Sequence, residues 1–268
     1  MSRWEIVTTT SGAPAMRDTL VGEVMHPTVG PLVESQQLYV AQSGLAQILD
    51  GLEGAGDPYV VFDVGLGAGA NAAALLRAAN SSRGRRLHVV SFERDLDALR
   101  LALTRPIDFG LDAALTAAAR RLLEDGHVES ERFTWELIAG ELPGTLALAV
   151  TPADLVIWDP FSPAANPSLW SVAAFTELRA HVADRARLFT YSSSTGVRAA
   201  LLLAGFAVGV GAPIGRKRET TAAAVAAHDL AHPLDARWLE RLGRTSVPLP
   251  EGAAATIARC PQFQSTNR

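Results

Sequence analysis

The stretch that decides the fold begins at Tyr59 and reads Tyr59-Val60-Val61-Phe62-Asp63-Val64-Gly65-Leu66-Gly67-Ala68-Gly69-Ala70-Asn71. A short apolar run leads into a glycine-rich turn, and an alanine-rich run follows at once, which predicts a strand, a tight bend and a helix. Glycines in such a bend permit a sharp turn and let a ligand approach bare backbone at the amino end of the helix. We therefore expect a ligand-binding edge of an α/β sheet at this point.

The same alternation of short apolar runs and longer alanine- or leucine-rich runs continues along the chain. Runs typical of strands cover 59–64, 87–92, 133–138, 154–158, 187–191, 206–210 and 219–225, and runs typical of helices cover 71–79, 95–103, 168–182 and 195–203. Strands that alternate with helices form parallel sheets covered on both faces. The prediction is a Rossmann-like α/β fold whose mostly parallel seven-stranded sheet ends in an antiparallel hairpin.

The chain divides into three parts. Residues 1–55 are expected to form an N-terminal elaboration packed on the core, residues 56–228 the main domain, and residues 229–268 a C-terminal tail with one short helix at 235–242. Residues from about 104 to 130 are longer than a usual connection and carry leucines at helical spacing. They predict a helical insertion after the second strand.

Composition narrows the class of protein. Of the 268 residues, 48% are hydrophobic and 19% charged, which is enough for a large buried core. Cys260 is the single cysteine, so no internal disulfide can form, and no signal peptide or membrane-spanning run is recognisable. We therefore expect a cytoplasmic protein with no membrane segment. The six histidines are scattered without ligand spacing, so no metal site is expected.

Acidic residues stand where successive strands are expected to end. The motif Gly65-x-Gly67-x-x-Ala70 also satisfies a dinucleotide fingerprint, so NAD has to be weighed. Pyrophosphate needs hydrogen-bond donors and a helix dipole, whereas a sulfonium cation favours nearby carboxylates. The acids therefore predict S-adenosyl-L-methionine as the cofactor. The predicted cofactor-binding residues are Asp63, Gly65, Gly67, Gly69, Asn71, Glu93, Glu141 and Asp159.

The strand at 154–158 delivers an aspartate to the same edge, and the sequence continues Asp159-Pro160-Phe161-Ser162-Pro163-Ala164-Ala165-Asn166-Pro167-Ser168-Leu169-Trp170. This stretch resembles the Asp-Gly-Phe-x-Pro-x-x-Asn-Pro-x-x-Trp signature of the methyltransferase domain of MnmC-type tRNA wobble-uridine modification enzymes, including stand-alone forms. The turn Gly215-Arg216-Lys217-Arg218-Glu219 is similar to the Gly-x-Lys-Arg-Glu turn of that family. The resemblance covers about residues 8–226. Pro160 stands where the family has glycine, which removes a backbone donor.

The resemblance implies a class I S-adenosyl-L-methionine-dependent methyltransferase. Its acceptor would be a primary amine, the aminomethyl group of a wobble 5-aminomethyl(-2-thio)uridine in tRNA. Asp159 and Phe161 would be the catalytic residues, with Asp159 acting chiefly by orienting the amine. The base and the phosphates of the anticodon region would be met by Phe161, Trp170, Arg198, Arg216, Lys217 and Arg218. A separate oxidoreductase acting upstream is a further implied partner.

Three alternatives stay open. The net charge of −4 and Pro160 favour methylation of a small-molecule or protein amine, whereas the cationic run 216–218 favours RNA. The second alternative is a binding module that has kept the fold and lost catalysis, against which Asp63, Glu93 and Asp159 argue. A nicotinamide-dependent oxidoreductase is the third. His26 and Glu34 could close the pocket, although a structural histidine is the favoured interpretation.

Overall fold

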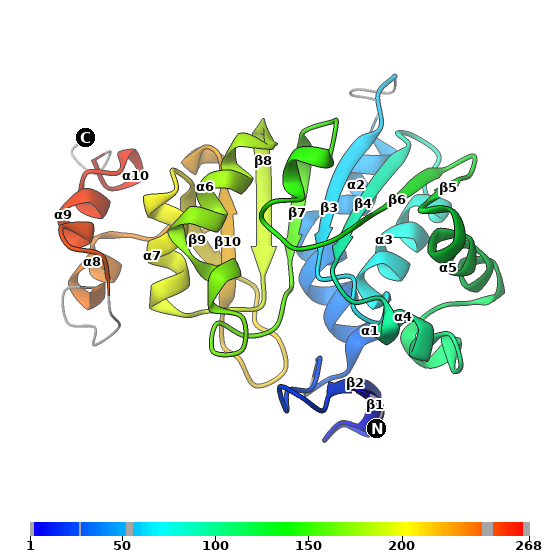
Figure 1. Cartoon of the computed structure of the whole chain (residues 1–268). Coiled ribbons are helices and arrows are strands. Elements are labelled where there is room, and N and C mark those ends of the chain that lie inside the picture. The colour runs from blue at the N-terminus through cyan, green and yellow to red at the C-terminus, as the bar shows by residue number, and fades with distance from the viewer. Residues whose placement is uncertain (1–2, 27, 52–55, 243–248, 265–268) are drawn as a thin grey trace.

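The computed structural model describes residues 3–26, 28–51, 56–242 and 249–264. Its centre is an eight-stranded sheet in the order β5-β6-β4-β3-β7-β8-β10-β9 (Figure 1). The strands are β3 (Tyr59–Val64), β4 (Leu87–Glu93), β5 (His127–Glu129), β6 (Phe133–Ala139), β7 (Ala153–Trp158), β8 (Val182–Thr190), β9 (Ala207–Gly211) and β10 (Thr220–Ala224). The five strands from β6 to β8 are parallel, and β5 and β10 run antiparallel to their neighbours.

Two layers of helices cover the sheet because side chains of the central strands alternate between its faces. From β3, Val61 packs into the core beneath α2 (Leu45–Asp50), α3 (Ala70–Ser81) and α5 (Ala113–Asp125). Phe62, the next residue, packs into the core beneath α6 (Val172–Ala180) and α7 (Thr195–Leu203). Every residue of β3 is buried, and burial on both faces explains why the strand is apolar except at Asp63.

Shorter elements complete the chain. An N-terminal hairpin pairs β1 (Trp4–Thr8) with β2 (Pro14–Asp18), and α1 (Pro31–Glu34) continues into a π-helical segment, Ser35–Ala41. The remaining helices are α4 (Asp97–Ala102), α8 (Ala236–Leu242), α9 (Ala253–Ala258) and α10 (Pro261–Gln264), with 3-10 turns at Pro106–Phe109, Leu146–Leu148, Pro167–Trp170 and Ala227–Asp229. No helix in the described ranges is long and apolar enough to cross a membrane.

The predicted mostly parallel sheet and its closing antiparallel pair are confirmed, with two differences. The sheet has an eighth strand, β5, because the end of the expected insertion adds a three-residue edge strand that is too short to show a periodic pattern. The expected helix 168–182 is divided, since Pro167–Trp170 forms a 3-10 turn and α6 begins only after Ser171, whose side chain accepts from the Ala174 amide.

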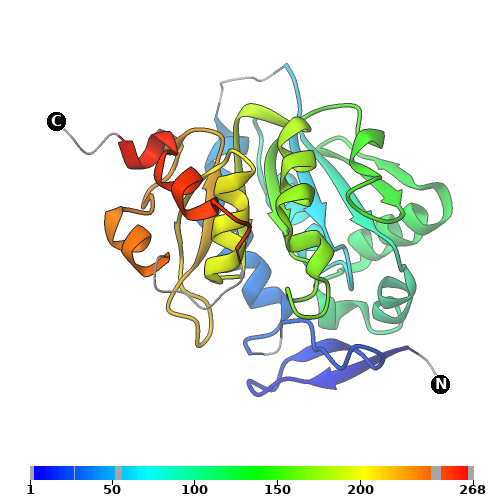
Figure 2. The same ribbon diagram turned by 60° about the vertical axis from the view of Figure 1, so that its left-hand side comes forward.

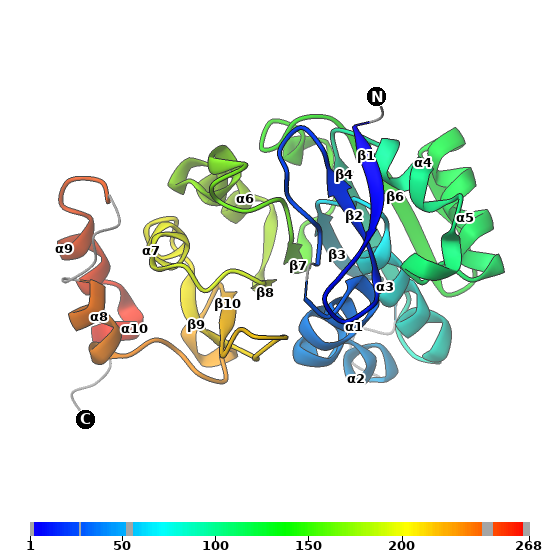
Figure 3. The same cartoon turned by 90° about the horizontal axis from the view of Figure 1, so that it is seen from below.

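The N-terminal hairpin and the C-terminal helices pack on different parts of the sheet. Figure 2 shows the β1–β2 hairpin beneath the body of the molecule, and Figure 3 shows it over the carboxyl ends of the central strands. The C-terminal helices pack beside α7 at the β9 edge of the sheet, where Trp238 and Ile257 are buried. The Gln262 side-chain amide accepts from the Val208 backbone amide and donates to the Val208 carbonyl. The described part of the tail therefore holds three helices, where the sequence predicts one. The proposed boundaries at 55/56 and 228/229 stay predictions.

Candidate active site

A cavity of about 600 Å³ opens at the carboxyl ends of β3, β4 and β7. This edge is where ligands bind in open α/β sheets. Its wall brings together six segments that are distant in sequence: residues 23–26 with 28–29, 64–68, 92–95, 140–142, 159–162 and 214–217. Most of the residues predicted from the sequence therefore meet in one place.

The glycine loop after β3 has the backbone conformation that only glycine adopts without strain. Gly65, Gly67 and Gly69 have φ of +90°, +53° and +83°. A β-carbon on Gly65 would lie 2.8 Å from the carbonyl oxygen of Asp159, and one on Gly67 would lie 3.0 Å from the sulfur of Met25. The loop is therefore packed against two neighbouring segments and offers bare backbone to the cavity.

Glu93 ties this loop to the end of β4. Its Oε2 accepts from the Gly67 amide at 3.0 Å, and its Oε1 accepts from the amides of Arg94 and Asp95 at 2.8 and 3.0 Å. Burial raises the pKa of Glu93, and these three donors act in the opposite direction. An ionised carboxylate has about four acceptor sites, so one remains for a ligand in the cavity.

Asp63 lies beneath the loop, fully buried, and is not part of the cavity wall. Ser91 Oγ donates to its Oδ2 at 2.8 Å, and Trp135 Nε1 donates to Ser91 Oγ at 2.9 Å. Its Oδ1 has no hydrogen-bond partner within the described ranges. Burial raises the pKa of Asp63 to about 7, and the carboxylates of Asp159 and Glu93 add to the shift. Asp63 therefore lies beneath the glycine loop and not in the cavity wall, which does not fit the direct cofactor contact predicted for it.

Asp159 stands at the centre of the site. Its backbone amide donates to the Val64 carbonyl at 2.9 Å, which fixes the turn after β7 against β3. Its Oδ2 accepts from Asn71 Nδ2 at 2.7 Å, and the Asn71 amide oxygen accepts from Ser35 Oγ at 2.5 Å. Burial raises the pKa of the Asp159 carboxyl to about 6, and Glu34 adds to the rise.

His26 faces Asp159 from the segment before α1. Its Nε2 lies 3.7 Å from Asp159 Oδ2, and its Nδ1 lies 3.5 Å from Glu34 Oε2. Burial lowers the pKa of His26, but the two carboxylates outweigh it and the net direction is upward. The sequence favoured a structural role for this histidine. The structure places it within the cavity wall, and a lone histidine before a proline gives no pattern that would have shown this.

The two predicted aromatic residues have different positions. Phe161 is in the cavity wall and stacks on Trp4, with ring centres 6.0 Å apart and planes inclined by 13°. Trp170 is buried behind it, outside the wall, and its Nε1 donates to the Phe161 carbonyl at 2.8 Å. It also packs edge-on against Tyr191 at 5.8 Å. Trp170 therefore supports the wall that Phe161 forms.

The four cationic residues predicted to contact phosphate also have different positions. Arg216 and Lys217 lie at the cavity, and Lys217 Nζ donates to the Tyr191 carbonyl at 3.1 Å. Arg218 is exposed next to them. Arg198, by contrast, is 2% exposed and donates to Thr221 Oγ1, the Thr220 carbonyl and Glu219 Oε1. This interior position does not fit the predicted phosphate contact, because its donors are used to join α7 to β10.

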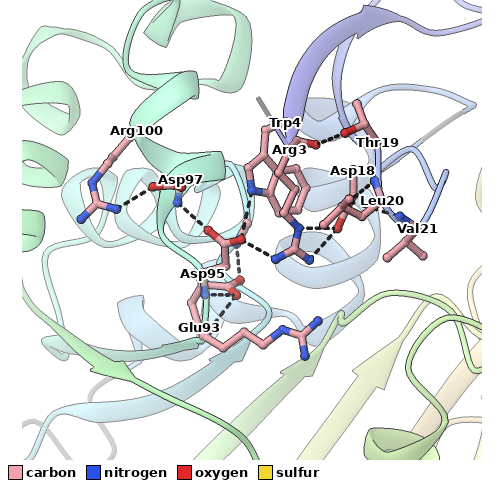
Figure 4. Close-up of polar contacts among 12 residues, drawn as sticks. Arg3, Trp4, Asp18, Thr19, Leu20, Val21, Glu93, Asp95, Asp97 and Arg100 are labelled. Carbon is pink, nitrogen blue, oxygen red and sulfur yellow. Dashed lines mark hydrogen bonds and ion pairs between the residues drawn. The ribbon is translucent and has the colours of Figure 1, made fainter. Parts of the chain in front are cut away.

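The N-terminal hairpin forms one side of the cavity, and an arginine fastens it there (Figure 4). Arg3 pairs with Asp18 and with Asp95, each at 2.6 Å. Trp4 Nε1 donates to the same Asp95 oxygen at 3.2 Å. No sequence pattern indicates this hairpin, because its two five-residue strands are partly exposed and do not alternate regularly.

Comparison with known proteins agrees with this geometry. A family model described as S-adenosyl-L-methionine-dependent methyltransferase matches residues 114–226. The tRNA 5-methylaminomethyl-2-thiouridine biosynthesis bifunctional protein MnmC of Aromatoleum aromaticum is 33% identical over 69% of this chain and 30% of its own length. The protein of the same name from Ralstonia nicotianae is 31% identical over 88% of this chain and 35% of its own. The crystal structure of MnmC2 from Aquifex aeolicus superposes with a TM-score of 0.73 at 25% identity, covering 96% of this chain and 83% of that one.

The chain belongs to the MnmC-type methyltransferases. It spans about a third of the length of the bifunctional relatives. The predicted class and cofactor are thereby confirmed: this is an S-adenosyl-L-methionine-dependent methyltransferase.

The residues of this MnmC-type site fit a cationic cofactor better than a dinucleotide. Burial raises the pKa of Asp63, Glu93 and Asp159, and carboxylates near Asp63 and Asp159 add to the rise, so a sulfonium beside them relieves repulsion. The Gly67 amide, which a pyrophosphate would need, already donates to Glu93. Glu141 is exposed at the rim of the cavity, where its Oε1 lies 3.3 Å from Arg94 Nη1.

Proposed function

We propose that this methyltransferase acts on the primary amine of wobble 5-aminomethyl(-2-thio)uridine in tRNA. The observation that carries the proposal is the single cavity that joins the glycine loop, Asp159 and the cationic loop at Arg216. The relatives in Aromatoleum and Ralstonia are named for the biosynthesis of tRNA 5-methylaminomethyl-2-thiouridine, the product of such a reaction.

The cofactor side of the site is assigned to the glycine loop and Glu93. S-adenosyl-L-methionine supplies an electrophilic methyl group on a sulfonium. Gly65 and Gly67 leave room for it at the backbone, and the remaining acceptor site of Glu93 suits a ribose hydroxyl. Asp63 contributes negative charge from beneath the loop, and Asn71 holds the Asp159 carboxylate.

Asp159 positions the nucleophile. With a pKa of about 6 its carboxylate is ionised at neutral pH and attracts an ammonium into the cavity. Alignment of the amine nitrogen with the methyl carbon is the main contribution of such a site, and proximity of this kind supplies about 7–11 kcal/mol in intramolecular analogues. The same carboxylate also favours the protonated amine, so the proton must leave to another group.

The remaining wall is assigned to the nucleotide. Phe161 offers a ring face for an extruded uracil, and Trp170 keeps that ring in place from behind. Arg216 and Lys217, with Arg218 beside them, would meet backbone phosphates at the cavity mouth. An oxidoreductase acting upstream, as a separate protein, would supply the aminomethyl group. A tRNA acceptor also places the protein in the cytoplasm.

The experiment is methyl transfer from labelled S-adenosyl-L-methionine to bulk tRNA from a strain that lacks this methylation, followed by mass spectrometry of the nucleosides. We expect label in 5-methylaminomethyl(-2-thio)uridine, and none with fully modified tRNA. Asp159→Asn should lower kcat by about 100-fold or more, since it removes the group that orients the amine. An enzyme that binds the cofactor and labels no tRNA would exclude this acceptor and favour a small-molecule or protein amine.

Charge reversal tests the cationic loop separately. Arg216→Glu with Arg218→Glu should raise KM for tRNA and lower its salt dependence, while the Kd for S-adenosyl-L-methionine stays unchanged. Arg120→Glu with Arg121→Glu on α5 is the matched control, because both arginines are exposed and lie outside the cavity wall. Equal effects of the two double variants would show that only net charge matters and not this loop.

A further inference from the structure

His26, Glu34 and Asp159 form a largely buried acid–histidine–acid series, in which the assignments above give a role to Asp159 and none to His26 or Glu34. The side chains are 12%, 10% and 7% exposed, and His26 stands between the two carboxylates at 3.5 and 3.7 Å. Glu34 ends α1, and Asp159 follows β7, so the sheet and the first helix hold the outer members from opposite sides. The arrangement aims one ring nitrogen of His26 at each carboxylate.

The backbone of His26 is in a conformation that residues with a β-carbon avoid. Its φ is +52°, and among the described residues it is the one non-glycine residue with positive φ. Such a conformation persists only where the surroundings fix it, and it concentrates at functional sites. With this backbone conformation the imidazole is part of the cavity wall.

Methylation of an amine requires a proton acceptor. The amine enters as an ammonium, and Asp159 stabilises that charged form. His26 is better suited to take the proton, because two carboxylates outweigh the effect of burial and raise its pKa above that of free imidazole. A base with a pKa near the operating pH is the most efficient in general-base catalysis.

We propose that His26 accepts the proton of the substrate ammonium and that Glu34 is its positioning residue, an inference that rests on the proposed function. Nδ1–H of neutral His26 points to Glu34 Oε2, so the lone pair of Nε2 faces the amine bound at Asp159. An N–H bond of the ammonium breaks and its proton forms imidazolium. The freed lone pair then forms the N–C bond as the S–C bond breaks, which leaves a neutral thioether and a secondary ammonium. The imidazolium returns its proton to water.

Other titratable groups face the same space and belong in the interpretation of any pH profile. From the described elements around His26 these are Glu23, Glu34, Tyr39, Asp159, Tyr191 and Lys217. Burial raises the pKa of both tyrosines and lowers that of Lys217. Asp159, with a pKa of about 6, and Asp63 beneath the loop, with a pKa of about 7, therefore also contribute to a profile in the neutral range.

The test uses single-turnover methylation of hypomodified tRNA from about pH 6 to 9 by variants chosen for the backbone at position 26. Asparagine and glycine both tolerate positive φ, so His26→Asn removes the base and His26→Gly also opens space for free imidazole. His88→Asn is the matched control. His88 lies 3.3 Å from Glu136 on β4 and β6, in a second histidine–glutamate pair outside the cavity wall.

The expected loss in His26→Asn is on the order of 100-fold in rate, with the Kd for S-adenosyl-L-methionine nearly unchanged. Its rate should rise about tenfold per pH unit, whereas the wild-type rate levels off once His26 is neutral. Imidazole should restore about tenfold or more in His26→Gly and nothing in His26→Asn. Wild-type rate and pH profile in His26→Asn, or no imidazole rescue, would overturn the assignment.

A titration without tRNA separates this inference from the proposed function. The pKa of His26, followed by NMR of its ring, should fall in Glu34→Gln because an attractive carboxylate is lost. The same substitution should move the rising limb of the rate profile to lower pH. An unchanged His26 pKa in Glu34→Gln would refute the role of Glu34 as the positioning residue of His26, even if tRNA is methylated. A lowered His26 pKa in Glu34→Gln, without any methylation of tRNA, would refute only tRNA as the acceptor.

Discussion

A methyl group added at Gly65 tests the central packing of the site, the contact between the glycine loop and Asp159. The β-carbon of Gly65→Ala would stand 2.8 Å from the Asp159 carbonyl oxygen and 3.2 Å from the Pro160 α-carbon, at a φ of +90°. A β-carbon at a left-handed φ costs about 1–2 kcal/mol. Overpacking against backbone that must shift adds about 1–3 kcal/mol, so the total is about 2–5 kcal/mol.

Gly205 provides the control for the backbone contribution. It has the same φ of +90°, at the end of α7, and no atom of the described chain lies within 4 Å of its β-carbon position. Gly205→Ala should therefore lose only the conformational part, about 1–2 kcal/mol. In a domain of this size each kcal/mol lowers Tm by about 2–4 °C. The expected decreases are about 2–8 °C for Gly205→Ala and up to about 20 °C for Gly65→Ala.

The assays are urea unfolding with both variants and calorimetric titration with S-adenosyl-L-methionine. Gly65→Ala should weaken cofactor binding by about tenfold or more, which corresponds to about 1.4 kcal/mol, because Asp159 and the loop can no longer approach each other. Gly205→Ala should bind like the wild type, since it is remote from the cavity wall. Equal unfolding free energies for the two variants, with intact cofactor binding in Gly65→Ala, would refute the packing argument.

Two further predictions concern buried charge. The folded pKa of Asp63 is raised to about 7 from 3.8, so the folded state binds more protons and its stability should fall as pH rises from about 4 to 7, by roughly 4 kcal/mol at most. Asp63→Asn should flatten this part of the pH–stability curve in thermal melts, and an unchanged slope would contradict the assignment. Arg198→Met should lower the unfolding free energy by about 3–5 kcal/mol while KM for tRNA stays as in the wild type, because the buried Arg198 binds β10 and not phosphate. A raised KM in enzyme that remains folded would restore the phosphate role.

Much of the fold follows from the sequence because the sheet is buried on both faces. β3 and β7 are apolar except at Asp63 and Asp154, and the glycine loop marks the point where β3 ends. The elements that the sequence does not show are those held by tertiary contacts. The β1–β2 hairpin has little core of its own and depends on Arg3 reaching Asp18 and Asp95, a pairing that no local pattern records.

For the site, too, the sequence predicts the residues that follow a local pattern and not those that depend on tertiary contacts. Asp159, Glu93 and the loop glycines occur at strand ends, a position that local pattern reveals. His26, whose role depends on a left-handed backbone and on Glu34 a helix away, has no such pattern. The wrong prediction for Arg198 has a related cause. α7 is buried from Val197 to Leu202, and no local pattern shows that Arg198 pairs there with Glu219.

The net charge of −4 does not indicate which substrate accepts the methyl group, because the charges that line the cavity differ between its interior and its mouth. The carboxylates of Asp159 and Glu34 lie inside, whereas Arg216 and Lys217 lie at the mouth, and the exposed Glu141 at the rim is paired with Arg94. At physiological salt, charges more than about 8 Å apart across solvent are largely screened, so a substrate responds to this local order and not to the sum. A wobble nucleotide with a cationic aminomethyl group and an anionic backbone matches the order from end to end. A small amine would use only the inner half of the cavity and would leave the cations at its mouth without a function. The whole cavity therefore favours the proposed nucleic-acid acceptor.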